Sequence, residues 1–158
     1  KTKELIQNIS ESKKSKIIFS ADISNCQKII EIIEKIGKHI VACKIHSDMI
    51  DNFETYIPKL IELSIKHKFL IMEDRKFNDI SYIVNMQYKK FRNWVDLVTV
   101  HSLVTNDVLS VLSGCLIVAN MSNNNYCWCM FVCFCFSRFF SACSFYITGS
   151  EPNLDKKF

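Results

Sequence analysis

Residues 69–74 read FLIMED, a run of four apolar residues that ends in two carboxylates. Similar runs precede it, KIIFSAD (16–22) and HIVACKI (39–45), and follow it, DLVTVHS (96–102) and CLIVANM (115–121). Continuous apolar runs, rather than alternating ones, predict strands in a sheet that is covered on both faces. Five such strands are therefore expected between residues 16 and 121.

Segments with helical spacing separate these predicted strands. The first predicted helix runs from an N-cap at Ser24 to a stop at Gly37, with isoleucines at helical intervals between them. Further helices are expected within 52–67, 79–90 and 104–112. Strands that alternate with helices at this spacing predict an α/β fold with a parallel sheet, either doubly wound or a (β/α)8 barrel. No glycine-rich loop follows the first strand, which counts against a Rossmann-type nucleotide site.

Composition restricts the possible classes of function. The chain has 158 residues, 49% hydrophobic and 23% charged, which is typical of one globular domain. The net charge is +4, and the basic residues are not interleaved with aromatic ones, so no nucleic-acid partner is expected. The polar opening at 1–15 contains no secretory signal, and Cys26, Cys43 and Cys115 lie in apolar or helical contexts as reduced thiols do. A cytoplasmic protein is the expectation.

The composition changes abruptly after Ser122. Residues 123–143 are rich in Cys and Phe and show no helical period. Three interpretations are open: a membrane span over 127–148, a metal site built on Cys-x-Cys pairs, or sequence that is not native coding, such as a translated intron or a frame error. The third is favoured, because a span would interrupt a barrel and the cysteine pairs lack His, acidic or turn residues between them. No metal and no membrane are therefore expected, and 144–158 reads as a possible sixth strand and truncated end.

Ionisable residues stand at the carboxyl ends of the first three predicted strands. These are Asp22, Lys44 and Asp74, and Lys76 follows two residues later. In a (β/α)8 barrel the chemistry is carried by residues at this end of the strands. A cluster of alternating acids and lysines is costly to bury unless it is used, so we expect the four side chains to share one site.

Three motifs resemble one family. FSADIS (19–24), CKIHSDMIDNF (43–53) and above all MEDRKFNDI (72–80) are similar to eukaryotic orotidine 5′-phosphate decarboxylases, most of all to the decarboxylase domain of uridine monophosphate synthase. Supporting matches extend the resemblance over roughly 16–122, and FYITGS (145–150) resembles the family's sixth strand. The resemblance implies a (β/α)8 TIM barrel, incomplete, with about six of its eight βα units.

The resemblance also implies a reaction, the cofactor-independent decarboxylation of orotidine 5′-phosphate to uridine 5′-monophosphate in pyrimidine biosynthesis. Lys44, Asp74 and Lys76 match catalytic residues. Asp74 resembles the carboxylate beside the substrate carboxylate, and Lys76 the general acid that protonates the ring carbon. Asp79 resembles an aspartate that reaches into the neighbouring subunit's site, which implies a homodimer.

Substrate-binding residues are implied in the same way, and Lys44 is one of them as well as a catalytic residue. Asp22 resembles the residue that contacts the ribose and orders the lysines, and His46 matches a residue lining the site. Ser20 and Ser122 resemble residues that hydrogen-bond the pyrimidine.

The sequence departs from the family at three places. Ser81, Tyr82 and Ile83 replace the family's Gly-Asn-Thr, and 101–107 contain no glycine where the family has several. A complete barrel needs about 250 residues, so this chain is expected to lack the phosphate-binding loops after strands seven and eight and to be inactive alone. Two alternatives remain, a non-catalytic homologue that acts as an interaction protein and another (β/α)8 enzyme with a phosphate-bearing substrate.

Overall fold

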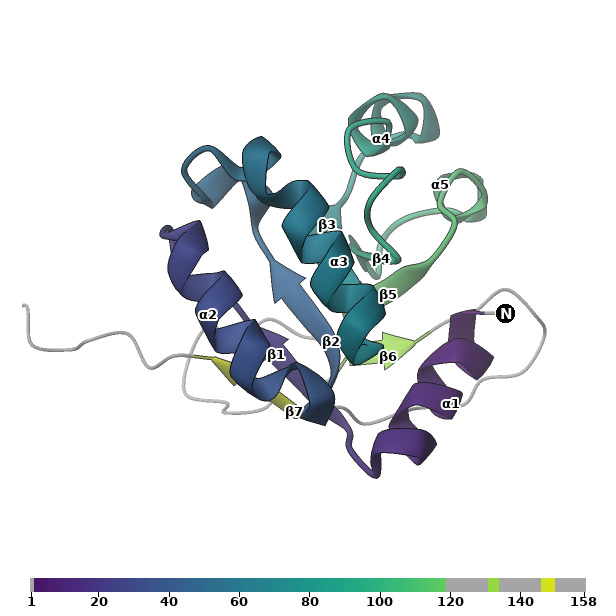
Figure 1. Cartoon of the computed structure of the whole chain (residues 1–158). Helices are drawn as coiled ribbons and strands as arrows, with labels where there is room; N and C mark the ends of the chain where they lie inside the picture. Colours follow the sequence, from purple (N-terminus) through teal and green to yellow (C-terminus); the bar gives the residue numbers. More distant parts are fainter. Residues whose placement is uncertain (1, 119–130, 134–145, 150–158) are drawn as a thin grey trace, which may run out of the picture.

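The computed structural model describes residues 2–118, 131–133 and 146–149, whose strands form one seven-stranded sheet (Figure 1). The strand order is β6-β5-β4-β3-β2-β1-β7. Strands β1 to β5 are adjacent in chain order and parallel, as on one side of a (β/α)8 barrel. The strands are β1 (Ile17–Ser20), β2 (Ile40–Ile45), β3 (Leu70–Phe77), β4 (Leu97–His101), β5 (Cys115–Val118), β6 (Phe131–Cys133) and β7 (Tyr146–Gly149).

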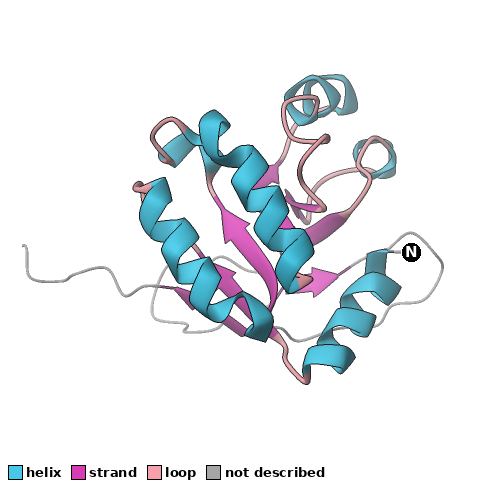
Figure 2. Ribbon diagram, in the orientation of Figure 1, coloured by secondary structure: helices cyan, strands magenta, loops and turns pink. Residues whose placement is uncertain are grey.

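Helices connect the parallel strands, and α2 and α3 lie side by side over one face of the sheet (Figure 2). None of the helices within the described ranges is long and apolar enough to cross a membrane. The helices are α1 (Thr2–Lys13), α2 (Cys26–Ile36), α3 (Ile57–His67), α4 (Ser81–Tyr88) and α5 (Asn106–Ser110), with 3₁₀ turns η1 (Gly37–His39), η2 (Ser47–Met49) and η3 (Phe53–Tyr56).

The sheet is buried on two faces, as the continuous apolar runs predicted. The face under α2 and α3, called the outer face here, carries Cys43 and Ile71 in the larger apolar cluster. The opposite, inner face carries Ala42 and Met72 in a second cluster. Successive strand residues alternate between the faces, so every residue of β2 is buried.

A helix in the polar opening segment was not predicted. α1 contributes Ile6 to the inner-face cluster, where that side chain is buried. At the helix C-terminus, Lys13 Nζ donates hydrogen bonds to the carbonyls of Gly37 at 2.9 Å and Ile40 at 2.7 Å. α1 thus lies at the amino-terminal end of β2, opposite the strand ends where chemistry is expected.

The predicted limits of the first helix need correction. Asn25, not Ser24, is the N-cap of α2, and its Oδ1 accepts a hydrogen bond from the backbone N–H of Lys28 at 3.0 Å. Gly37 does end the helix, but its φ of −53° is an ordinary helical value. Glycine is needed there because a Cβ would lie 2.8 Å from Cγ of His67.

The strand at 146–149 forms, but not in the place expected of a sixth strand. β7 pairs in parallel with β1, with Ser20 opposite Gly149, whereas a sixth barrel strand would pair with β5. The neighbour of β5 is instead β6, which is antiparallel to it. The predictions for 119–130, 134–145 and 150–158, Ser122 included, lie outside the described residues.

Candidate active site

Four polar side chains lie on the inner face near the carboxyl ends of β1 to β4: Ser20, Lys44, Asp74 and Thr99. All four are buried. Each stands two residues beyond an apolar inner-face residue, as Lys44 does beyond Ala42, so strand alternation points it to the same side. The carboxyl ends of neighbouring parallel strands meet at one edge, which brings the four side chains together.

Asp74 is the centre of the cluster. Its Oδ2 lies 2.9 Å from Lys44 Nζ, 2.8 Å from Lys76 Nζ and 3.3 Å from His46 Nε2. Its Oδ1 accepts a hydrogen bond of 2.7 Å from the hydroxyl of Thr99. Two ammonium groups therefore face one carboxylate whose side chain is only 4% exposed.

These contacts control the ionisation of Asp74. Burial by itself raises the pKa of this carboxyl, but the hydrogen bond from His46, the charge of Lys44 and the hydrogen bonds from Lys76 and Thr99 outweigh it. The pKa of Asp74 lies well below its usual range. The carboxylate is charged at every physiological pH, which keeps both lysines oriented toward it.

Asp22 and Ser20 extend the cluster toward β1. Asp22 Oδ1 lies 3.2 Å from Lys44 Nζ, and its Oδ2 accepts a hydrogen bond of 2.9 Å from Ser20 Oγ. The four charged residues expected to share a site are thus brought together, with His46 beside them. Asp79 is outside this network: it is exposed, and its Oδ1 accepts from the backbone N–H of Ile80 at 2.7 Å.

The backbone of β3 is irregular where it carries Lys76. Glu73 pairs with Val98 and Phe77 with Val100, so β3 has extra residues between the two pairs, as in a bulge. Lys76 has a left-handed φ of 51°, a conformation that is strained for a residue with a side chain. In this irregular segment the Lys76 ammonium lies on the same face of the sheet as Asp74, 2.8 Å from its Oδ2.

Thr99 is a site residue that sequence reasoning missed. Its Oγ1 accepts a hydrogen bond of 2.8 Å from the Lys76 backbone N–H and donates to Asp74, so it joins the bulge to the carboxylate. A signal was present: Thr99 is a lone hydroxyl in the apolar run LVTV (97–100), and a fully buried hydroxyl needs a partner.

Glu73 was also missed. Its pKa is raised above the ordinary value, whereas the pKa of Asp74 is lowered. Burial raises the pKa of this fully buried carboxyl to about 7, against the lowering effect of hydrogen bonds from Ser47; the charge of Asp48 adds to the rise and that of His46 opposes it. Between about 4.5 and about 7 the folded state therefore holds a proton that the unfolded chain has lost. We expect this group to lower the free energy of unfolding as pH rises through that window, by about 3 kcal/mol at most.

Glu73→Gln removes this titration. The free energy of unfolding of the variant should therefore decrease much less between pH 4.5 and 7 than that of the original chain. Urea unfolding at several pH values measures it, with Glu31→Gln on the exposed side of α2 as the control. An unchanged pH slope in Glu73→Gln would show that the carboxyl is ionised in the folded state across this range.

Five consecutive parallel strands with a lysine–carboxylate cluster at their carboxyl ends are the arrangement of one part of a (β/α)8 barrel, with charged residues at the end where barrel proteins carry their active sites. The model of the orotidine 5′-phosphate decarboxylase / HUMPS family matches residues 15–126. The chain belongs to this family.

Individual relatives agree with this assignment. Orotidine 5′-phosphate decarboxylase of Candida dubliniensis is 38% identical over 110 residues, which cover 66% of this chain and 41% of that protein. Uridine 5′-monophosphate synthase of Bos taurus is 34% identical over 128 residues, which cover 73% of this chain and 27% of the relative. The chain thus spans less than half the length of these two relatives.

Solved structures support the fold. Orotidine 5′-phosphate decarboxylase from Pyrococcus horikoshii superposes with a TM-score of 0.57 at 21% identity, over 68% of this chain and 53% of the other. The enzyme from Methanocaldococcus jannaschii gives 0.57 at 18% identity, over 70% and 57%. This chain matches only about half of each solved structure, so the prediction of an incomplete (β/α)8 barrel is confirmed.

Proposed function

We propose that this chain contains the N-terminal part of the catalytic barrel of an orotidine 5′-phosphate decarboxylase, a carbon–carbon lyase that forms uridine 5′-monophosphate. The observation that carries the proposal is the convergence of Lys44 and Lys76 on Asp74 at the carboxyl ends of the strands, with Asp22 paired to Lys44. A homologue that served only as an interaction protein would have no physical need to bury such a cluster.

The cluster suits a reaction that passes through a carbanion. Loss of carbon dioxide from the pyrimidine leaves a carbanion that no π-system delocalises, so positioned charge must stabilise it. Lys76 would place its ammonium beside the carbanion and deliver the proton to the ring carbon. Asp74 would hold the ammonium groups of Lys44 and Lys76 in place and lie beside the substrate carboxylate, whose departure relieves the repulsion between the two carboxylates. No cofactor is needed for these steps.

The substrate contacts that we propose are those implied by the resemblance to the family. Asp22 is 44% exposed on its side chain and would contact the ribose, while His46 lines the site next to both carboxylates. Ser20 and Ser122 would hydrogen-bond the pyrimidine; Ser20 already donates to Asp22 and would have to share that hydroxyl.

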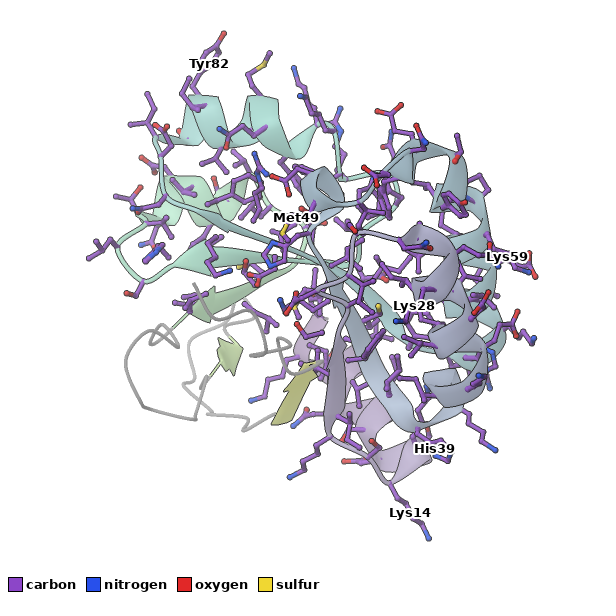
Figure 3. All side chains as sticks on the ribbon, turned by 90° about the vertical axis from the view of Figure 1, so that its left-hand side faces the viewer. Lys14, Lys28, His39, Met49, Lys59 and Tyr82 are labelled. Carbon is purple, nitrogen blue, oxygen red and sulfur yellow. The ribbon has the colours of Figure 1, made fainter. Side chains whose placement is uncertain are left out.

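The proposed active form is a homodimer in which Asp79 completes the partner's site. Asp79 is exposed, and apolar side chains that are also exposed follow it: Ile80 is 68%, Tyr82 69% and Met86 47% exposed. Tyr82 projects outward from α4 in Figure 3. Exposed apolar residues around a polar one are typical of a subunit interface. Ile83 is half-buried in α4 and supplies no hydroxyl for this contact.

We propose the cytoplasm as its compartment. Cys26 and Cys43 are buried free thiols, and burial raises the pKa of Cys43 to about 12. Unreactive reduced thiols suit a reducing environment.

The 158-residue chain alone is expected to show no decarboxylation of orotidine 5′-phosphate above background. The family's phosphate-binding loops follow later strands, and phosphate binding energy is used at the reacting centre, so its loss lowers turnover as well as affinity. Release of labelled carbon dioxide from carboxyl-labelled substrate measures this. Turnover that Lys76→Ala abolishes would contradict it.

A chimera tests the proposed function itself. Residues 16–118 replace the matching stretch of the Candida dubliniensis decarboxylase, which supplies the remaining strands and the phosphate loops. The chimera should decarboxylate orotidine 5′-phosphate if the half-site of this chain is competent. A folded chimera without turnover would contradict the proposal.

A further inference from the structure

Four consecutive residues of β3, from Glu73 to Lys76, alternate between the two faces of the sheet. Asp74 and Lys76 enter the inner-face cluster. Glu73 lies on the outer face, two residues after Ile71, and is fully buried. Arg75 also points outward, with its guanidinium 5.9 Å from the ring centroid of Phe91 in the outer cluster. The proposed chemistry uses the inner pair and leaves the outer pair without a role.

Both outer residues contact the loop that follows β2. The backbone N–H of Ser47 donates to Glu73, with distances of 3.1 Å to Oε2 and 3.3 Å to Oε1. Arg75 Nη1 lies 2.6 Å from Asp48 Oδ2. Ser47 and Asp48 directly follow His46, whose ring lies 3.3 Å from both Asp74 Oδ2 and Lys44 Nζ.

Packing alone does not hold this loop. Ile45 and Ile50 are buried, but none of the side chains at 46–49 is. A cavity of about 780 Å³ borders the loop, lined among others by Ser47, Asp48 and Arg75. The Glu73 contact is the buried one, where losing a hydrogen-bond partner costs most, whereas the Arg75–Asp48 pair is partly exposed and weaker.

We propose that Glu73 and Arg75 are positioning residues. They bind the loop at Ser47 and Asp48 and so keep the His46 ring in contact with Asp74 and Lys44. The proposal rests on the proposed function, in which this cluster does the chemistry. One strand would then set both halves of the site: its inner residues form the cluster, and its outer residues fix the loop that completes it.

The test uses the 158-residue chain without substrate and two NMR readouts, amide hydrogen exchange at Ser47 and Met49 and the ring signals of His46. Glu73→Met removes the acceptor at similar size and should speed exchange at Ser47 by about tenfold or more and move the His46 ring signals. Glu73→Gln keeps an oxygen acceptor. In this variant the exchange rate at Ser47 should stay within about twofold of that in the original chain, and the His46 ring signals should stay at their original positions.

Ile71→Val is the matched control, because it weakens the same outer face of β3 without touching the loop. His46 signals in Glu73→Met that coincide with those of Ile71→Val would overturn the proposal. If Glu73→Met does not fold, Arg75→Met and Asp48→Asn take its place, and unmoved His46 signals in both would overturn it equally. Since no readout depends on turnover, an inactive chimera would contradict the proposed function and leave this result standing.

Discussion

Lys76→Ala in the chimera is expected to lower kcat by about 10²- to 10⁴-fold, with a much smaller change in KM. The Lys76 ammonium lies 2.8 Å from Asp74, and the Lys76 side chain is 27% exposed, so it contacts the carboxylate and is still accessible to a substrate. Removing it takes away the proton donor and a positive charge that acts in the transition state. Steady-state assays of carbon dioxide release measure the change.

Lys28→Ala is the control for this substitution. Lys28 is an exposed lysine of α2, labelled in Figure 3, and its side chain takes no part in the cluster. It should leave kcat unchanged. A Lys76→Ala chimera that keeps more than about a tenth of kcat would remove Lys76 from the proposed chemistry, because general acid catalysis alone contributes more than that.

Asp74→Ala is expected to lower the free energy of unfolding of this chain by about 3–5 kcal/mol. The substitution leaves the Lys44 ammonium, whose side chain is 7% exposed, with Asp22 as its remaining carboxylate and removes the acceptor of the Thr99 hydroxyl. Removing one partner of a buried charge pair is among the largest single-residue effects on stability. Urea unfolding measures the difference, and Asp51→Ala, at an exposed aspartate of the β2–α3 loop, should change it by less than about 0.5 kcal/mol.

The pH dependence provides a second check on Asp74. Its folded-state pKa is depressed below the ordinary value of 3.8, so its contribution is complete above that pH and is lost as pH falls below it. The gap between the original chain and Asp74→Ala should therefore narrow below about pH 4. A gap of constant size from pH 7 to pH 3 would mean that charge pairing is not what Asp74 contributes. The stability contribution of Glu73, its neighbour on β3, changes with pH in the opposite direction, because burial raises the pKa of Glu73.

Much of the fold could be predicted because the residue types along a strand indicate whether one or both of its faces are buried. The runs at 39–45 and 69–74 are apolar on both faces, which only a covered parallel sheet satisfies. Lys44 and Asp74 close those runs, so their meeting at one edge followed from topology alone. α1 was missed because its apolar side is narrow and becomes buried only against the inner face, which no local pattern reveals.

The sequence by itself determined the parallel α/β order, the family motifs and the acids and lysines at the strand ends. Only the tertiary structure decided that Asp74 is their centre, that Thr99 joins it to the bulge at Lys76, and that Glu73 faces away from it. It also placed the strand at 146–149 beside β1 rather than β5. The physical reason is that residue type and spacing encode which face a side chain takes, whereas contacts between residues distant in the chain depend on register, bulges and strand neighbours, which are set only when the whole sheet assembles.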